Sequence, residues 1–248
     1  MGTVPVILPR RSCRQKNVAR EGRVRFRVEV SDSTGLFVGL SAESFWIDWG
    51  DGIVDDDLMH TYDFAGSYDV VISGSAINQL NLARCWLKSI DLSECPWLEY
   101  LDVSFNFLTK LDVACCPHLI VLLCGHSLIR ELEMGDHLPW LVYLDCSCNQ
   151  LERLVFPLFC GLQYLQADRN QLSNLDFRNC PELHNVDMAD NALPPLALQD
   201  ALDSLPVVSP DVSAWVMYEF NPFCEELSEE QVRKKGWHCI EMEKEGYE

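Results

Sequence analysis

The side chains that could perform chemistry in this sequence are twelve cysteines, six histidines and a run of aspartates. A histidine beside a serine, cysteine or aspartate would suggest nucleophilic catalysis. The histidines occupy non-equivalent positions of the repeat described below, which brings no such nucleophile to any of them. They are His60, His118, His126, His137, His184 and His238. The sequence also contains no phosphate-binding or dinucleotide-binding glycine motif, so we expect no catalytic residues, no cofactor and no enzymatic activity.

Two groups of residues could suggest a metal site. The tripeptides CGH at 124–126 and CSC at 146–148 are too closely spaced for ordinary zinc pairs, and alternation along a strand sends some of these side chains outward. An acidic segment could suggest calcium, but its spacing is not that of a known calcium loop. It contains Asp48, Asp51, Asp55, Asp56 and Asp57. We interpret it as a structural turn and a solvated loop, with calcium as the alternative, and expect no metal.

A repeated stretch of about 21 residues must position most of these side chains. In the copy from Leu98 to Leu108, LEYLDVSFNFL, the apolar residues and Asn106 follow the spacing L-x-x-L-x-L-x-x-N-x-L. The successive copies start 21, 21, 22, 21 and 21 residues apart. They begin at Ile77, Leu98, Leu119, Leu141, Leu162 and Leu183. This period predicts a leucine-rich repeat solenoid, mainly β, with stacked parallel strands and little helix.

Each copy predicts a short strand with inward leucines, followed by a turn whose asparagine amide satisfies buried backbone groups. The predicted ladder contains Asn106, Asn149, Asn170 and Asn191, with Ser127 as a weak rung and Cys85 in the first copy. The second half of each copy predicts an extended convex side, because 21 residues leave too little chain for a full helix. The additional residue of the 22-residue copy is expected as a bulge within 134–139, and the period is expected to end after Asn191.

The repeat also accounts for many of the cysteines. Cys124 and Cys146 take the same inward position in consecutive copies, and Cys95, Cys116 and Cys180 share another. Stacked coils repeat about every 4.8 Å, but parallel side chains on neighbouring strands have the wrong vectors for a disulfide. We interpret these residues as a ladder of buried thiols that pack as small hydrophobic side chains.

The flanking sequences are expected to cover the apolar ends of the solenoid. Before the repeats, strands are expected at 24–30, 45–49 and 68–72, with a tight turn that requires positive backbone dihedrals at Gly50 and Gly52. These three strands are too few for a complete β-sandwich, so we expect a reduced β-cap.

After the repeats, a helix is expected between Pro195 and Pro206, with Leu198, Ala201, Leu202 and Leu205 on one face. Strands are expected at 214–218 and 237–242. A capping box formed by Ser228 and Gln231 predicts a second helix, with Lys234 and Lys235 in its last turn and Gly236 as its C-terminal cap. The predicted organisation is a basic, flexible arm at 1–22, a β-rich cap at 23–75, six repeats at 76–194 and an α/β cap at 195–248.

The charge distribution limits the classes of partner. Residues 1–28 carry eight basic residues and one acidic residue, Glu21, which leaves 19 minus 8, or 11, basic and 38 minus 1, or 37, acidic residues. A body with a net charge of −26 repels nucleic acid and anionic membranes and favours basic partners. The sequence has no run of 18 apolar residues and no convincing signal peptide. We therefore expect no nucleic-acid binding, no membrane insertion, a monomer and, for the chain as given, a cytoplasmic start.

Two sequence resemblances add to this interpretation. The segment IDWGDG at 47–52, with HTYDFAGSYDVVISG at 60–74, resembles PKD-type β-sandwich modules. The repeats resemble the bacterial internalin-type family, particularly its class with 21-residue, cysteine-containing repeats. The tail, NPFC at 221–224 and KKGW at 234–237, is similar to the end of bacterial proteins that join a PKD-like cap to such repeats. The resemblance implies a binding protein that is displayed on a cell surface or secreted.

The outward residues of the strands define the candidate binding surface. The register places Tyr100, Tyr143 and Tyr164 in one column of the concave face and Asp102, Leu123, Asp145 and Asp187 in the next. Asp168 belongs to a third column, and Phe105 and Arg169 belong to the rim. Exposed tyrosines beside carboxylates are typical of recognition surfaces. The alternative is that the tyrosines cover the sheet and the aspartates keep it soluble.

These ten residues support three hypotheses. The first is a non-enzymatic protein-recognition module whose concave face binds a basic or polar protein partner. The second is a carbohydrate-binding surface protein, because aromatic side chains with carboxylates can also stack on sugars. The third, an enzyme with a fused catalytic domain, is disfavoured because only about 55 residues follow the repeats and they have the pattern of a cap.

Overall fold

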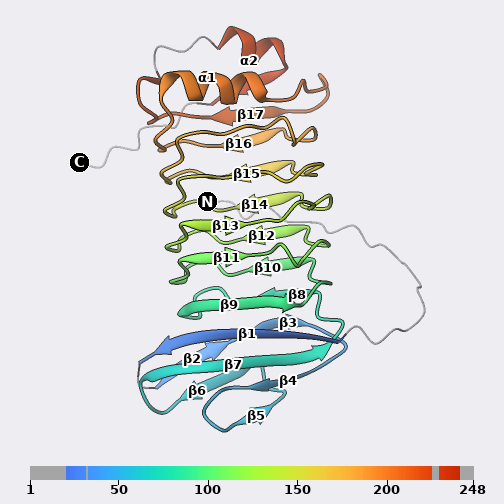
Figure 1. The fold of residues 1–248 in the computed structure, drawn as a ribbon, viewed down its shortest axis with the longest axis vertical. Helices are drawn as coiled ribbons and strands as arrows, with labels where there is room; N and C mark the ends of the chain where they lie inside the picture. The colour runs from blue at the N-terminus through green and yellow to red at the C-terminus, as the bar shows by residue number, and fades with distance from the viewer. Residues whose placement is uncertain (1–20, 32, 225–228, 241–248) are drawn as a thin grey trace.

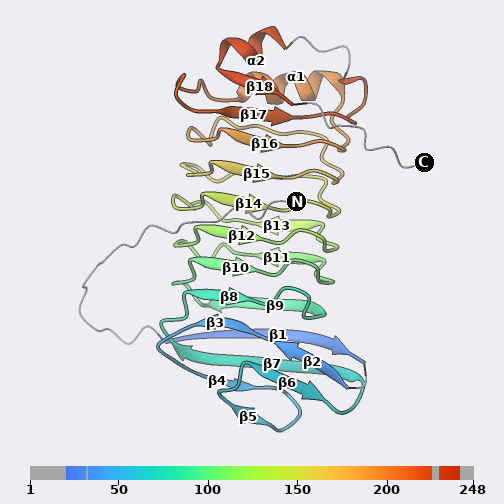
Figure 2. The ribbon, with the colours of Figure 1, turned by 180° about the vertical axis from the view of Figure 1, so that it is seen from behind.

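The computed structural model describes residues 21–31, 33–224 and 229–240. Parallel strands stack along a solenoid, with a β-rich cap at one end and two helices at the other (Figures 1 and 2). The principal sheet has nine strands in the order β18-β17-β16-β15-β14-β12-β10-β8-β3. They are β3 (Gly39–Ser41), β8 (Gln79–Asn81), β10 (Tyr100–Asp102), β12 (Val121–Leu123), β14 (Tyr143–Asp145), β15 (Tyr164–Gln166), β16 (Asn185–Asp187), β17 (Ala214–Met217) and β18 (Trp237–Cys239). The predicted fold class is confirmed.

The asparagine ladder connects neighbouring coils as predicted. The Asn106 amide nitrogen donates to the carbonyls of Leu82, Val103 and Ser104 at 2.9–3.1 Å. Its Oδ1 accepts from the backbone N–H groups of Cys85 and Leu87, each at 3.0 Å. Asn149, Asn170 and Asn191 make equivalent bonds in three consecutive coils, after the coil in which Ser127 takes the ladder position. Each amide thus satisfies backbone groups of two coils that would otherwise be buried without partners.

The 21-residue period ends after Asn191, but the stack of parallel strands continues into the C-terminal cap. β17 pairs in parallel with β16, and β18 pairs in parallel with β17. Asn221 continues the ladder, because its Oδ1 accepts from Leu193 N at 3.1 Å and its amide donates to the carbonyls of Met188 and Tyr218. Phe220 has φ +60°, like the rim residue before each earlier ladder asparagine. A helix lies between these two ladder residues and lengthens their spacing. The seventh copy therefore does not follow the 21-residue period.

The cysteine interpretation is confirmed for the predicted positions. Cys95, Cys116, Cys124, Cys146 and Cys180 are buried, and all eleven described cysteines are free thiols. Burial raises the pKa of Cys95 to about 11 and that of Cys116 to about 12, so both remain protonated at neutral pH.

Two further cysteines contact the repeat framework. Cys85 replaces the first asparagine by donating from its Sγ to the carbonyls of Phe37 and Ala83. Cys160 was not predicted as part of the ladder, because it lies two residues before its repeat leucine instead of three. It nevertheless contacts Cys180 in the core.

The convex side is extended in the first three coils, where the structure contains β9 (Leu87–Glu94), β11 (Lys110–Asp112) and β13 (Glu131–Glu133). β11 and β13 pair with a 21-residue offset, Lys110 with Glu131, whereas β12 and β14 pair with a 22-residue offset. The additional residue therefore follows Glu133, within the predicted segment. Gly135 has φ +67° there, a conformation that favours glycine.

The N-terminal cap contains more strands than predicted. A five-stranded sheet, β5-β4-β7-β1-β9, lies against a two-stranded sheet, β2-β6 (Figures 1 and 2). The strands are β1 (Glu21–Val30), β2 (Thr34–Phe37), β4 (Ser44–Asp48), β5 (Val54–Asp55), β6 (Met59–Tyr62) and β7 (Gly66–Ser75). β1, β4 and β7 were predicted, whereas β2, β3, β5 and β6 have only two to four residues each and leave little periodicity.

The cap continues into the first coil, because β1 pairs with β9 and β3 pairs with β8. The predicted basic arm lies outside the described residues except for Glu21 and Gly22, which belong to β1. The resemblance of this cap to PKD-type modules stays a prediction.

The acidic segment of the cap forms the predicted turn. Gly50 and Gly52 have φ +82° and +98°. Asp48 accepts from Gly50 N at 3.0 Å and Asp51 accepts from Ile53 N at 3.1 Å. A second Asp51 oxygen lies 2.7 Å from Nε2 of the buried His60, which stacks on a tryptophan ring. Asp48 and Asp51 are thus engaged in hydrogen bonds of the turn and with His60, as the structural interpretation predicts.

The C-terminal cap contains α1 (Pro195–Ser204) and α2 (Glu230–Lys234). α1 begins at Pro195 and buries Leu198, Ala201 and Leu202, as predicted. Gly236 follows α2 with φ +90°, and Lys235 Nζ donates to the Leu205 carbonyl at 2.9 Å, beyond the end of α1. The predicted capping box involves Ser228, and the last predicted strand extends to Met242; both residues lie outside the described ones. Neither described helix is long and apolar enough to span a bilayer.

Candidate recognition surface

The strand register places the predicted columns on one face of the principal sheet. Tyr100 pairs with Gln79 and Val121, and Tyr143 pairs with Val121 and Tyr164. The next column runs through Asn81, Asp102, Leu123, Asp145, Gln166 and Asp187. Seven of the ten predicted residues therefore lie in strands of the same sheet, whereas Phe105, Asp168 and Arg169 follow the strands.

The tyrosines differ in exposure, which corrects the expectation that all three are exposed. Tyr164 is 37% exposed, whereas Tyr100 and Tyr143 are half-buried. The Tyr143 hydroxyl donates to Gln166 Oε1 at 3.0 Å, and burial raises the pKa of this phenol to about 12. The rings of Tyr143 and Tyr164 are stacked with their centroids 6.0 Å apart, and the rings of Tyr164 and His184 meet edge to face with their centroids 4.8 Å apart. Strand alternation gave the direction of these side chains but not the contacts that cover them.

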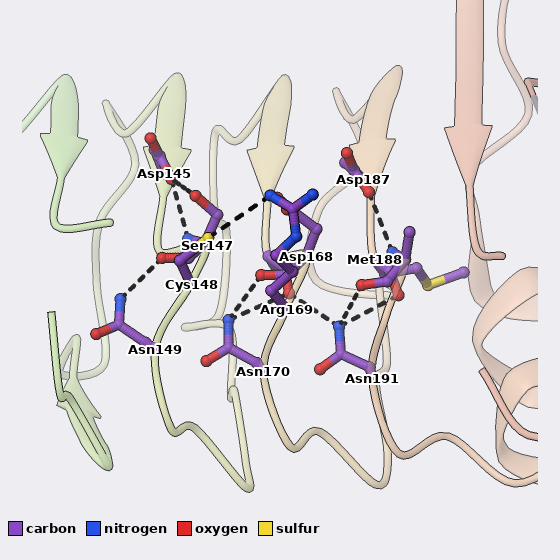
Figure 3. A network of polar contacts seen from close by, with 12 residues as sticks. Asp145, Ser147, Cys148, Asn149, Asp168, Arg169, Asn170, Asp187, Met188 and Asn191 are labelled. Atoms are coloured by element: carbon purple, nitrogen blue, oxygen red, sulfur yellow. Dashed lines mark hydrogen bonds and ion pairs between the residues drawn. The ribbon is translucent and has the colours of Figure 1, made fainter. Parts of the chain in front are cut away.

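The aspartates of the second column have a structural role at the ends of their strands. Asp102 Oδ1 accepts from the backbone N–H and the hydroxyl of Ser104, at 3.0 and 2.6 Å. Asp145 makes the same pair of bonds to Ser147, and Asp187 accepts from Ala189 N at 3.0 Å (Figure 3). These are Asx turns, which fix the chain where each strand ends. Asp102 is only 8% exposed and is therefore not available to a partner.

The C-terminal half of the face gathers several charges (Figure 3). Arg169 Nη1 lies 3.8 Å from Asp168 Oδ2 and 3.9 Å from the Cys148 sulfur. Burial raises the pKa of Asp168, and the neighbouring charge of Asp145 raises it further. Burial likewise raises the pKa of Asp187 to about 6, with additional contributions from Asp168 and Asp145. Three carboxylates thus share one nearby guanidinium, which favours a cation at this part of the surface.

The remaining predicted residues lie toward the N-terminal half. Phe105 is 42% exposed, stacks on the His126 ring at 4.3 Å and lies under Arg84, whose guanidinium carbon is 3.9 Å from the ring centroid. Leu123 is half-buried in the aspartate column. Phe105 contributes to an aromatic rim, whereas Tyr143, Asp145, Tyr164, Asp168, Arg169 and Asp187 form one polar and aromatic cluster. We call these six residues the concave cluster.

The face also includes residues that the sequence interpretation did not assign to it. Trp215 pairs with Asn185, and His238 pairs with Trp215, so both extend the tyrosine column into the C-terminal cap. Trp215 is half-buried and His238 is exposed. The signal that could have identified Trp215 is V-x-Y-x-x-N at 216–221, a shortened form of the repeat spacing.

The described residues contain no group of three or more histidine, cysteine, aspartate or glutamate side chains arranged to hold a metal ion. Asp145 and Asp187 are held in separate coils by their Asx turns, and Asp168 lies in the coil between them. The side chains of this surface offer hydrogen bonding, aromatic contact and attraction of positive charge.

Comparison with known proteins gives little further information. No protein-family model matches the chain, and no curated protein matches it. Among solved structures, the chain is similar to the functional domain of InlJ from Listeria monocytogenes, which is described as including a cysteine ladder. The alignment has 15% sequence identity and a TM-score of 0.31, and it covers 65% of this chain and 49% of that one. The chain thus spans about half the length of that domain, and its own strand register and asparagine ladder define its fold.

Proposed function

We propose that this chain is a non-enzymatic protein-recognition module that binds its partner on the C-terminal half of the concave face. The observation that supports this proposal most is the concave cluster, in which two stacked tyrosines lie beside three carboxylates and a single arginine. Tyrosine supplies rigid contact area with one polar atom, which is typical of residues that dominate binding energies. The excess of carboxylates favours a partner that presents lysine or arginine side chains.

The N-terminal half of the face contributes less to this proposal. Asp102 is buried in its Asx turn, and Tyr100 has Gln79 and Val121 beside it in the column instead of a second tyrosine. We therefore assign the principal contacts to Tyr143, Tyr164 and Asp168, with Phe105 at the periphery. Residues of Asx turns orient the backbone beneath the contact surface, so their substitution would perturb the surface indirectly.

A photo-crosslinking experiment tests the location of this surface. A benzoylphenylalanine at position 164 should form an adduct with a protein partner in an extract of the native host, whereas one at Leu196, which is 75% exposed on α1, should not. The adduct is identified by mass spectrometry, and the purified partner is then mixed with the wild-type chain. Adducts at both positions with the same proteins, or none at position 164, would contradict the proposal. Binding to a glycan array instead of a protein would favour the carbohydrate alternative.

A further inference from the structure

One coil of the convex side departs from the others at a regularly acidic position. The residue six places after each ladder position is Asp91, Asp112, Glu133 or Asp176 in four coils, but Val155 in the coil between the last two. Three of these aspartates accept a hydrogen bond from the backbone N–H two residues on, at 2.9–3.0 Å. The acidic residue therefore serves a turn that recurs along the convex side.

The coil with Val155 has lost both partners of that hydrogen bond. The residue two places after Val155 is Pro157, which has no backbone N–H and needs no acceptor. The presence of valine at 155 therefore leaves no backbone N–H without a hydrogen-bond acceptor. What it changes is the surface, because a valine that is 64% exposed replaces a charged side chain.

Two more apolar side chains are exposed in the same coil. Leu158 is 57% exposed and Phe159 is 78% exposed. The residues at the position of Leu158 in other coils are Glu94, Cys115, Asp136 and Asn179. Together, Val155, Leu158 and Phe159 form what we call the convex apolar patch. Burying such side chains is favourable, so their joint exposure on one surface favours association.

The backbone of this coil fixes the patch in place. Phe156 faces inward against Phe177, with ring centroids 5.7 Å apart. The Asn179 amide donates to the Phe156 carbonyl, and Cys160 N donates to the Asn179 carbonyl, both at 3.1 Å. Phe159 lies between these anchors with φ +58°, a conformation that a bulky residue rarely adopts. This turn directs the Phe159 ring to solvent and allows Cys160 to take the buried position.

The charge around the patch determines which partner fits it. On the preceding coil Glu133 and Asp136 are exposed without a basic residue between them, whereas Arg153 is exposed two residues before Val155 and Asp176 on the following coil is paired with Arg178. A second copy of this chain would bring the same acidic surroundings, and its net charge of −19, against the patch. Like charges of this size oppose self-association and favour a positively charged partner.

We propose that the convex apolar patch is a second recognition surface, which binds a protein segment with apolar side chains flanked by lysine or arginine. The segment places its apolar groups on Val155, Leu158 and Phe159, and its cationic groups contact Glu133 and Asp136. This surface lies on the convex side and is independent of the concave cluster.

A displayed library of short random peptides tests this proposal without knowledge of the natural partner. The library is selected on the immobilised wild-type chain and counter-selected on the variant Leu158→Ser/Phe159→Ser. Enriched peptides should combine apolar residues with lysine or arginine, and their affinity should fall at least tenfold on the variant and with added salt. Val155→Asp, which introduces here the residue type of the other coils, should also weaken binding, whereas Leu196→Ser and Tyr164→Ala should not. Thermal melting confirms that each variant is folded.

Several results would overturn the proposal. One is a set of peptides that bind the double variant as well as the wild type, and another is enrichment of acidic or uncharged peptides. Sedimentation velocity supplies the third: a concentration-dependent dimer that is lost in Leu158→Ser/Phe159→Ser would show that a second copy occupies the patch. Loss of peptide binding in Tyr164→Ala alone would instead assign the peptides to the concave cluster.

Discussion

Replacing Asp187 by asparagine should stabilise the protein in a pH-dependent manner. Asp187 is in the concave cluster, where burial and the charges of Asp168 and Asp145 raise its pKa to about 6 from an ordinary value of 3.8. Asparagine can retain the Asx turn, because Asn81 makes the same bond to Ala83 N at 3.0 Å in the first coil. The substitution therefore removes the charge and leaves the turn intact.

The sign and size of this effect follow from the pKa difference. Below pH 3.8 the carboxyl is neutral in both the folded and the unfolded state, so the charge contributes no destabilisation. As the pH rises through about 6, the folded protein must ionise a carboxyl that the unfolded chain ionises more easily, and stability is lost. One pKa unit corresponds to about 1.36 kcal/mol, so a difference of about two gives an upper value near 3 kcal/mol. Because Arg169 and solvent reduce the repulsion, we expect a gain of roughly 1–3 kcal/mol at pH 7.5.

Urea denaturation of the wild type and Asp187→Asn between pH 4 and pH 8 measures this gain. The difference in unfolding free energy should be small at pH 4, increase between pH 4 and pH 6 and level off above that. Asp112→Asn, which replaces an Asx-turn aspartate on the exposed convex side, is the control for the turn itself. A gain that does not change with pH, or a loss of stability at pH 7.5, would refute the raised pKa of Asp187.

Three further predictions concern the framework. Asn149→Ala should lower the unfolding free energy by roughly 2–4 kcal/mol, because it removes the hydrogen-bond partner of the Ile129 N–H and of the Cys124 carbonyl, which belong to the preceding coil. An equilibrium urea titration checks this prediction. Burial raises the pKa of Asp51, but hydrogen bonds from Ile53 N and His60 outweigh it, so the pKa is lowered and this carboxylate should stabilise the fold above pH 3.8 and less as the pH falls. Asp51→Asn should therefore make the melting temperature less sensitive to acid. An unchanged dependence of the melting temperature on acid pH would contradict that assignment. Thiol titration with a disulfide reagent should label the exposed Cys115 in the folded protein but the fully buried Cys124 only after unfolding, and rapid native labelling of Cys124 would contradict the buried ladder.

The repeat architecture could be predicted because two independent signals have the same period. Leucines at fixed intervals require a buried face, and asparagines at a fixed offset satisfy the backbone of the turn that follows. Both signals fail where the chain inserts residues between coils. The spacing from Asn191 to Asn221 is 30 residues because α1 lies between them, and Cys160 is displaced by one residue because Phe159 occupies an outward turn.

The candidate site was predicted only in part, for a different physical reason. Alternation along a strand gives the direction of Tyr100, Tyr143 and Tyr164, but their exposure depends on neighbours such as Gln166 that belong to other coils. The Asx turns of Asp102 and Asp145 could have been anticipated from a serine two residues after each aspartate. Their hydrogen bonds make these residues part of the framework beneath the surface.

The most direct test of the proposed function is the affinity of the purified partner, identified by crosslinking at position 164, for concave-face variants. Isothermal titration should show at least a tenfold weaker complex with Tyr143→Ala/Tyr164→Ala, since aromatic anchors typically contribute about 2 kcal/mol or more to an interface. Leu196→Ser should bind like the wild type. Equal affinity of the wild type and the double tyrosine variant would contradict recognition by the concave face.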